Sequence, residues 1–141
     1  MSKWINFDLL KQTEKHEGRR PTPYTDSLGN LTQAIGHLVM SPLSDATMEF
    51  MLVEDYQEVI RNVKKKQPWI LEPRAMNQVR RNVFLEMVFN LGIRNFGKFK
   101  RMIKAAKAKD WQTAHDEALD SLWAKQVKGR AKTLAKQILN G

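Results

Sequence analysis

A wide apolar face runs along residues 75–91 and predicts a helix buried in the centre of the fold. Its apolar residues recur at helical spacing: Val79, Val83, Phe84, Met87, Val88 and Leu91. Polar side chains interrupt this face chiefly at residues 80–82 and at Glu86. A helix of this kind needs other elements packed around it.

Amphipathic patterns predict further helices along the rest of the chain, over residues 4–17, 44–64, 96–108, 110–123 and 128–139. The candidate inner positions of the first are Trp4, Ile5, Leu9 and Leu10. Gly18 is the expected residue after its end, and Ser44 is a natural N-cap for the second. The apolar side of that second helix consists of Met48, Leu52, Tyr56, Val59 and Val63.

Residues 19–39 have a different character and predict a small antiparallel sheet. Asp26 and Gly29 stand at the first and fourth positions of a turn, as in a type I turn, and short segments follow. Pro21 and Pro23 lack amide donors, which places their strand at an edge. We therefore predict an α+β fold.

The length of 141 residues, 42% of them hydrophobic, is enough for one domain with a real core. We predict a single domain over residues 1–141. Its β-hairpin lobe spans about 18–40, and its larger helical lobe spans about 1–17 and 41–141 and contains the central buried helix.

Composition excludes several classes of protein. The chain has no cysteine, and His16, His37 and His115 are scattered without metal-ligand spacing, so we expect neither a metal nor another cofactor. The N-terminal segment lacks the apolar core of a secretory signal and no stretch is apolar enough to span a bilayer, so we expect a soluble cytoplasmic protein. The net charge of +9 favours a polyanionic partner or surface.

Three polar residues around the predicted hairpin suggest a catalytic site. Glu17 lies nine positions before Asp26, and Thr32 follows across the same hairpin, so a chain reversal brings the three side chains together. Glycoside hydrolysis needs one protonated carboxylic acid and one carboxylate. The end of a helix disfavours the charged form of Glu17, whereas free amides in a turn keep Asp26 ionised. Each residue alone has a simpler structural interpretation: a helix-end charge, a turn residue and a β-former.

The pattern resembles that of phage-type lysozymes, glycoside hydrolase family 24. The residues that match its E-G, Y-x-D, G, T and G-H signature are Glu17-Gly18, Tyr24, Asp26, Gly29, Thr32 and Ile35-Gly36-His37. The spacing of the glutamate, aspartate and threonine is that of the family's T-even phage member. Residues 79–81 and 87–92 resemble the family's central helix, and Trp111, Trp123 and residues 130–132 resemble its C-terminal helices.

This resemblance implies a muramidase that cuts the β-1,4 bond between N-acetylmuramic acid and N-acetylglucosamine with inversion of configuration. Glu17 is then the general acid, and Asp26 with Thr32 places the attacking water. Leu38 and Phe89 are expected to contact the sugar chain, with Asn90 beside it. Plain core packing is the alternative for Leu38 and Phe89.

The resemblance also implies that His37 pairs with Asp55 and that Arg130 lies near Glu17. It implies a role in host-cell lysis, with synthesis in the host cytoplasm and access to periplasmic peptidoglycan through a membrane lesion made by a holin-type protein. We expect a monomer without stable membrane insertion.

The sequence departs from the family at several places, one of which is a shorter stretch between His37 and Ser44. Ala34 replaces a glycine of the common T-x-G-x-G-H pattern, at a position that favours positive φ. Met102 and Glu117 differ in type from residues with which the T-even phage enzyme contacts substrate, so those contacts are not carried over.

Two other functions stay open from the sequence. A lytic transglycosylase also uses a catalytic glutamate, although its chemistry needs no placed water. The lysines and arginines of residues 98–109 and 125–136 suggest a cationic module that binds anionic outer-membrane or wall polymers. No aromatic platform or motif for nucleic acid is present, so we expect no nucleic-acid partner.

Overall fold

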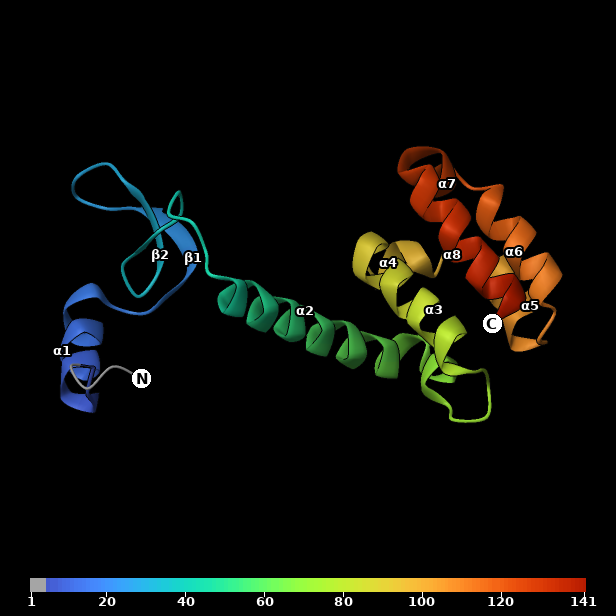
Figure 1. Ribbon diagram of the computed structural model, residues 1–141, viewed down its shortest axis with the longest axis horizontal. Helices are drawn as coiled ribbons and strands as arrows, with labels where there is room; N and C mark the ends of the chain where they lie inside the picture. Colours follow the sequence, from blue (N-terminus) through green and yellow to red (C-terminus); the bar gives the residue numbers. More distant parts are fainter. Residues whose placement is uncertain (1–4) are drawn as a thin grey trace. The chain divides into compact units, whose positions relative to one another are not determined.

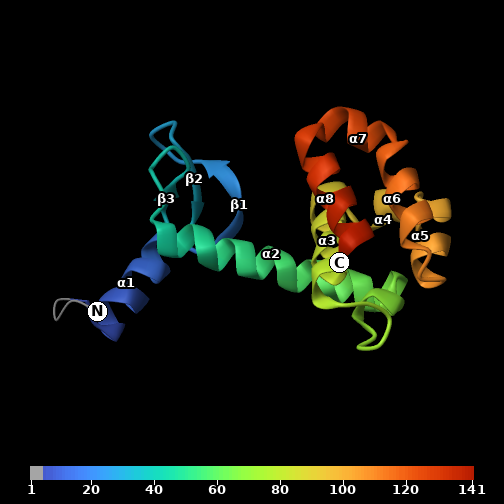
Figure 2. The same cartoon turned by 45° about the vertical axis from the view of Figure 1, so that its right-hand side comes forward.

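The computed structural model describes residues 5–141 as helices with one small antiparallel sheet (Figures 1 and 2). The α+β class predicted from the sequence is confirmed. The chain forms two compact units, Met1–Met48 and Glu49–Gly141. No helix among the described residues is long and apolar enough to cross a bilayer.

The first unit contains one helix followed by three strands. These are α1 (Phe7–Glu17), β1 (Arg20–Thr25), β2 (Leu31–Ala34) and β3 (His37–Leu38). Asn6 caps the start of α1, where its side chain accepts a hydrogen bond from the Leu9 N–H at 3.0 Å. The helix ends where predicted, because Gly18 adopts a φ of 74° and donates its N–H to the Glu14 carbonyl at 2.9 Å.

The sheet has the order β1-β2-β3, so β1, which carries both prolines, is an edge strand as predicted. Its register with β2 is irregular between Arg20 and Tyr24, where the two prolines lie. Tyr24 pairs with Thr32, and Thr32 pairs with Leu38 on the other side. Residues directly opposite one another share a face, so these three side chains form a row across the sheet.

The predicted inner positions of α1 are not supported by the first unit taken alone. No residue of α1 is buried, and Ile5, Leu9 and Leu10 are exposed. The prediction that these residues face a core is therefore wrong for this unit. Trp4 lies outside the described residues.

Eight further helical elements follow: α2 (Asp45–Lys66), η1 (Pro68–Leu71), α3 (Gln78–Leu91), α4 (Ile93–Phe96), α5 (Lys100–Lys107), α6 (Trp111–Leu119), α7 (Leu122–Val127) and α8 (Gly129–Asn140). Ser44 caps α2 as predicted, since its Oγ accepts from the Thr47 N–H at 3.2 Å. Val59 and Val63 of α2 are buried, whereas Met48 and Leu52 on the same predicted side are exposed.

The centre of the second unit is α3, as its apolar face predicts. Val83, Phe84, Met87 and Val88 are buried, and the Phe84 ring meets Trp69 and Phe96 edge-on at centroid distances of 5.3 and 6.3 Å. Helix α8 packs beside α3 and α6 (Figure 2).

An arginine on α3 forms hydrogen bonds with the C-terminal end of α8. Arg80 donates from Nε to the Ile138 carbonyl at 2.8 Å and from Nη2 to the Leu139 carbonyl at 2.9 Å. Its guanidinium also lies 4.3 Å from the centroid of the Trp111 ring. These bonds satisfy carbonyls that the last turn of a helix leaves without partners.

Two of the C-terminal helical stretches differ from the prediction. The stretch predicted as 110–123 divides into α6 and α7 because Ser121 caps a new helix, accepting from the Ala124 N–H at 3.1 Å. The stretch predicted as 96–108 begins as a helix only at Lys100, after the separate short helix α4.

Candidate functional site

Glu17 is the last residue of α1, and its side chain reaches the turn between β2 and β3. A Cβ added to Gly36 would lie 2.8 Å from Glu17 Oε2 and 2.9 Å from its Cδ, closer than real contacts allow. The carboxyl group therefore occupies the space that a side chain at residue 36 would fill. Gly36 also adopts a φ of 70°, which favours glycine for a second reason.

Asp26 is held by hydrogen bonds from its own turn. Its Oδ1 accepts the backbone N–H groups of Leu28 at 2.9 Å and Asn30 at 2.8 Å, and its Oδ2 accepts the Asn30 side-chain amide at 3.1 Å. The turn itself closes through the Gly29 N–H, which donates to the Asp26 carbonyl at 3.1 Å. The sequence did not single out Asn30, although an aspartate that bonds backbone N–H groups just after it is a common turn motif.

These bonds favour the ionised form of Asp26. The backbone N–H of Asn30 contributes most to holding the pKa of Asp26 below its ordinary value of 3.8. The Asn30 side chain, the Leu28 N–H and the Thr32 hydroxyl add to this lowering of the pKa, and desolvation opposes it. The direction agrees with the expectation that Asp26 stays a carboxylate.

Thr32 is a buried polar residue in the middle of the sheet, 3% exposed. Its hydroxyl donates to the Asn30 carbonyl at 3.3 Å and also lies near enough to Asp26 to lower the pKa of that carboxyl. Asp26, Asn30 and Thr32 thus form one hydrogen-bonded group.

The strand β2 relates the three predicted catalytic residues to one another. The turn that holds Asp26 precedes β2, and Thr32 lies within β2. Gly36, against which the Glu17 side chain packs, follows β2. A strand of four residues spans about 10 Å from its first to its last Cα. The first unit therefore gathers all three side chains around a single short strand.

The predicted sugar contacts Leu38 and Phe89 belong to different units. Leu38 lies beside Thr32 on β3 and is 44% exposed, so it is not part of its unit's core. Phe89, on α3, is 38% exposed and stacks on Tyr56 of α2 with ring centroids 4.9 Å apart and planes inclined by 17°. Their contact with substrate stays a prediction.

Asn90 has a structural partner. Its Oδ1 accepts the indole N–H of buried Trp123 at 2.8 Å, a bond between α3 and α7. Arg130 pairs with Glu86 at 2.9 Å within the second unit. The expected pairs His37–Asp55 and Arg130–Glu17 each join one unit to the other and stay predictions.

Comparison with known proteins decides the family. The family model described as phage lysozyme matches residues 14–138, which include the end of α1, the hairpin and all but the last residues of the helical unit. The chain belongs to the phage lysozyme family. This membership makes it a glycoside hydrolase of the lysozyme type.

Three relatives extend this result. The chain is 29% identical to the pre-baseplate central spike protein Gp5 of Enterobacteria phage T4 over 96% of its own length, and it spans 28% of the length of that protein. It is 24% identical to probable T4-type lysozyme 2 of Dictyostelium discoideum, with 88% of this chain and 87% of that protein covered. With probable T4-type lysozyme 1 of the same organism it shares 23% identity over 95% of this chain and 93% of that protein.

Ala34 shows one departure from the phage lysozyme pattern. The backbone adopts a φ of 56° there, in the left-handed region that favours glycine, so the expectation of a positive φ at this position is confirmed. The hairpin keeps this conformation with a Cβ present, at a cost of about 1 kcal/mol.

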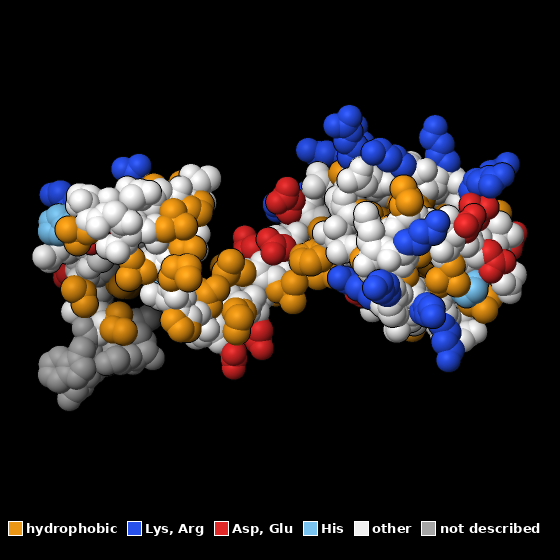
Figure 3. Space-filling model, turned by 90° about the horizontal axis from the view of Figure 1, so that it is seen from above, with side chains coloured by type: hydrophobic (Ala, Val, Ile, Leu, Met, Phe, Trp, Pro, Cys, Tyr) orange, Lys and Arg blue, Asp and Glu red, His pale blue; other side chains and the backbone are white. Residues whose placement is uncertain are grey.

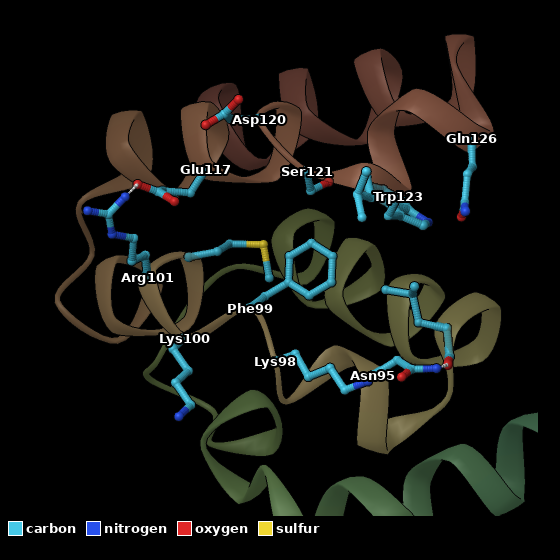
Figure 4. Close-up of a pocket in the computed structure, with 13 residues that line it drawn as sticks. Asn95, Lys98, Phe99, Lys100, Arg101, Glu117, Asp120, Ser121, Trp123 and Gln126 are labelled. Atoms are coloured by element: carbon cyan, nitrogen blue, oxygen red, sulfur yellow. Dashed lines mark hydrogen bonds and ion pairs between the residues drawn. The ribbon is translucent and has the colours of Figure 1, made fainter.

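Two other departures, Met102 and Glu117, line a cavity of about 700 Å³ in the helical unit (Figure 4). Met102 is buried, and Glu117 pairs with Arg101 at 3.6 Å across α5 and α6. Apolar side chains of Phe99 and Trp123 form part of the wall.

Proposed function

We propose that this phage lysozyme domain is a muramidase that hydrolyses the β-1,4 bond between N-acetylmuramic acid and N-acetylglucosamine in bacterial peptidoglycan. Family membership supports lysozyme chemistry. The observation that carries the finer assignment is the packing of the Glu17 carboxyl against Gly36, beside the strand that contains Thr32 and follows the Asp26 turn.

In the proposed reaction, Glu17 donates a proton to the glycosidic oxygen as the bond to the anomeric carbon breaks. Asp26, kept ionised by the amides of its turn, accepts a hydrogen bond from a water molecule, and Thr32 orients that water. The water attacks the anomeric carbon from the face opposite the leaving group and loses its proton to Asp26. This gives inversion, the outcome associated with carboxyls far enough apart to admit a water.

The proposal is tested by digestion of purified peptidoglycan in oxygen-18 water. Hydrolysis places one oxygen-18 atom in each new reducing end, and N-acetylmuramic acid is expected at that end. Proton NMR during the first turnovers is expected to show the inverted anomer. A product lighter by one water, without the isotope, identifies a lytic transglycosylase and contradicts the proposal.

Charge supports a second element of function, attraction to anionic polymers of the bacterial envelope. Residues 1–48 contain five Lys or Arg and five Asp or Glu, so the net charge of +9 lies on residues 49–141. Lysine and arginine side chains are numerous on the face of this unit that Figure 3 shows. Salt weakens such attraction steeply, so binding to isolated outer-membrane or wall polymers is expected to fall as ionic strength rises.

We also propose a role in host-cell lysis by a monomeric enzyme that reaches peptidoglycan after a holin-type protein has opened the membrane. The test compares cells with intact and permeabilised inner membranes that both express the enzyme. Lysis only after permeabilisation is expected. Lysis without it contradicts the requirement for a lesion.

A further inference from the structure

The helical unit contains a pocket of about 360 Å³ that shares no residue with the candidate site. It lies between the segment after η1 and the end of α5. Its lining residues are Trp69, Glu72, Arg74, Ala75, Ala106, Lys107 and Lys109. Three of them are cations, and one is an acid.

One of these cations is held in place by the backbone. Lys109 Nζ donates to the carbonyl of Arg74, 35 positions away, at 3.2 Å. The bond joins the two sides of the pocket. A lysine held in this way loses less freedom when it binds an anion than a free surface lysine does.

The residue at position 109 is also unusual for its backbone. The Lys109 N–H bonds the Ala106 carbonyl at 3.0 Å, and the Asp110 N–H bonds the Ala105 carbonyl at 2.9 Å, which is the pattern of a Schellman motif at the end of α5. Lys109 has a φ of 59° at the position where glycine is usual. A lysine there costs about 1 kcal/mol, and residues that break a local rule are found preferentially at functional sites.

The pocket has an aromatic wall beside its cations. Trp69 is nearly buried, and its indole N–H donates to Gln67 at 2.8 Å, which fixes the ring. The Lys107 ammonium lies 6.0 Å from the centroid of that ring. Among residues 5–141, none of Arg74, Lys107 and Lys109 forms an ion pair within 4.0 Å. Their charges are therefore available to a ligand.

We propose that this pocket binds a phosphoryl group carried by a saccharide or polyol. Three cations opposed by the single carboxylate of Glu72 favour an anion, and a phosphoryl oxygen set accepts from several donors at once. The volume exceeds that of a lone phosphate and leaves room for a sugar or glycerol against Trp69. The inference rests on the proposed attraction to anionic envelope polymers and gives that attraction a defined site.

The test follows the indole N–H signal of Trp69 in the ¹⁵N-labelled full chain, assigned with Trp69→Phe. Glucose 1-phosphate and glycerol 3-phosphate serve as probes for the two sources, and glucose and glycerol serve as uncharged controls. Both phosphates, or one of them, are expected to shift this signal saturably, and the uncharged compounds are not. No saturable shift with either phosphate overturns the proposal.

Matched charge variants separate a site from diffuse attraction. Lys107→Gln with Lys109→Gln removes two charges from the pocket, and Lys132→Gln with Lys136→Gln removes two exposed charges from α8. The pocket variant is expected to lose about tenfold or more in phosphate affinity, the control much less. Equal losses would show diffuse attraction and overturn the site while leaving polymer attraction intact.

Measurements of peptidoglycan hydrolysis distinguish the proposed phosphoryl site from the proposed muramidase function. Both double variants are expected to retain the rate of the parent on purified peptidoglycan stripped of phosphorylated polymers, measured well below the melting temperature of each variant. Competition by duplex DNA as effective, per phosphate, as that by glucose 1-phosphate would contradict a pocket shaped for a phosphorylated sugar or polyol.

Discussion

Replacement of Gly36 by alanine is expected to displace the side chain of Glu17. The new Cβ would lie 2.8 Å from Oε2, 2.9 Å from Cδ and 3.0 Å from Cγ of Glu17, whereas ordinary contacts begin at 3.4 Å. The carboxyl, at the far end of a flexible side chain, is therefore expected to move by about 0.6 Å, the difference between 3.4 and 2.8 Å. Misplacement of a reacting group by about 1 Å lowers the rate by about 10²-fold.

Gly36→Ala also strains the backbone, and a control must carry the same strain. Gly92 has a φ of 76°, close to the 70° of Gly36, and no atom lies within 4 Å of a Cβ added to it. Both variants are expected to lose about 1–2 kcal/mol of stability. Only Gly36→Ala is expected to lose about 10²-fold in kcat/KM, because only its Cβ meets the acid.

The assay measures the release of soluble fragments from purified peptidoglycan well below the melting temperature of each variant, so that all of the protein is folded. Circular dichroism gives that temperature. Gly36→Ala with the kcat/KM of Gly92→Ala would refute the assignment of Gly36 as the residue that makes room for the acid. A loss of activity only in proportion to unfolded protein would refute it as well.

Three other predictions concern stability. Ala34→Gly relieves a left-handed backbone and is expected to raise the melting temperature, with a gain of up to about 1 kcal/mol; a lower melting temperature would contradict the strain. The folded pKa of Asp26 is lowered, so its stabilising effect is present above the unfolded value of 3.8 and is lost as pH falls through the folded value. The melting temperature of Asp26→Asn should therefore decrease less than that of the parent as the pH falls below 3.8. The same decrease in both proteins would contradict a stabilising role for the Asp26 carboxylate. Asn90→Ala leaves the Trp123 indole N–H without its acceptor and is expected to lower the free energy of unfolding by about 1–3 kcal/mol, measured by urea denaturation. An unchanged midpoint would show that the bond is unimportant.

Local sequence patterns predicted much of the fold. The apolar face of α3, the Ser44 cap, the Gly18 terminus and the edge position of the proline-containing strand all depend on neighbouring residues and backbone chemistry. Such features do not depend on contacts between residues far apart in the chain. For that reason they can be predicted from the sequence.

Features that depend on contacts between residues far apart in the chain were not predicted from the sequence. The amphipathic pattern of α1 predicts an inner face, but which residues are covered is decided by packing, and none is buried in its own unit. The break between α6 and α7 was missed for another reason: the Ser121 cap is a local feature that the sequence analysis did not single out. The bonds of Arg80 to the end of α8 join residues almost 60 positions apart.

In the candidate site, too, local features were predicted from the sequence and contacts between distant residues were not. The Asp26 turn and its amides follow from local chemistry, although the part of Asn30 is seen only in the structure. The role of Gly36 toward Glu17 depends on the approach of a helix end to a hairpin turn, which spacing alone does not give. Family resemblance supplied the catalytic residues, and the structure supplied the contact between Glu17 and Gly36.

The central claim is that Glu17 supplies the proton that cleaves the glycosidic bond. The most direct measurement is kcat/KM on purified peptidoglycan for Glu17→Gln beside Glu14→Gln, the same chemical change one turn earlier in α1. Glu14 pairs with Arg19 at 2.9 Å on the surface, so its variant is expected to remain active. Glu17→Gln is expected to lose at least about 10²-fold with an unchanged melting temperature. Equal activity of the two variants would contradict the claim.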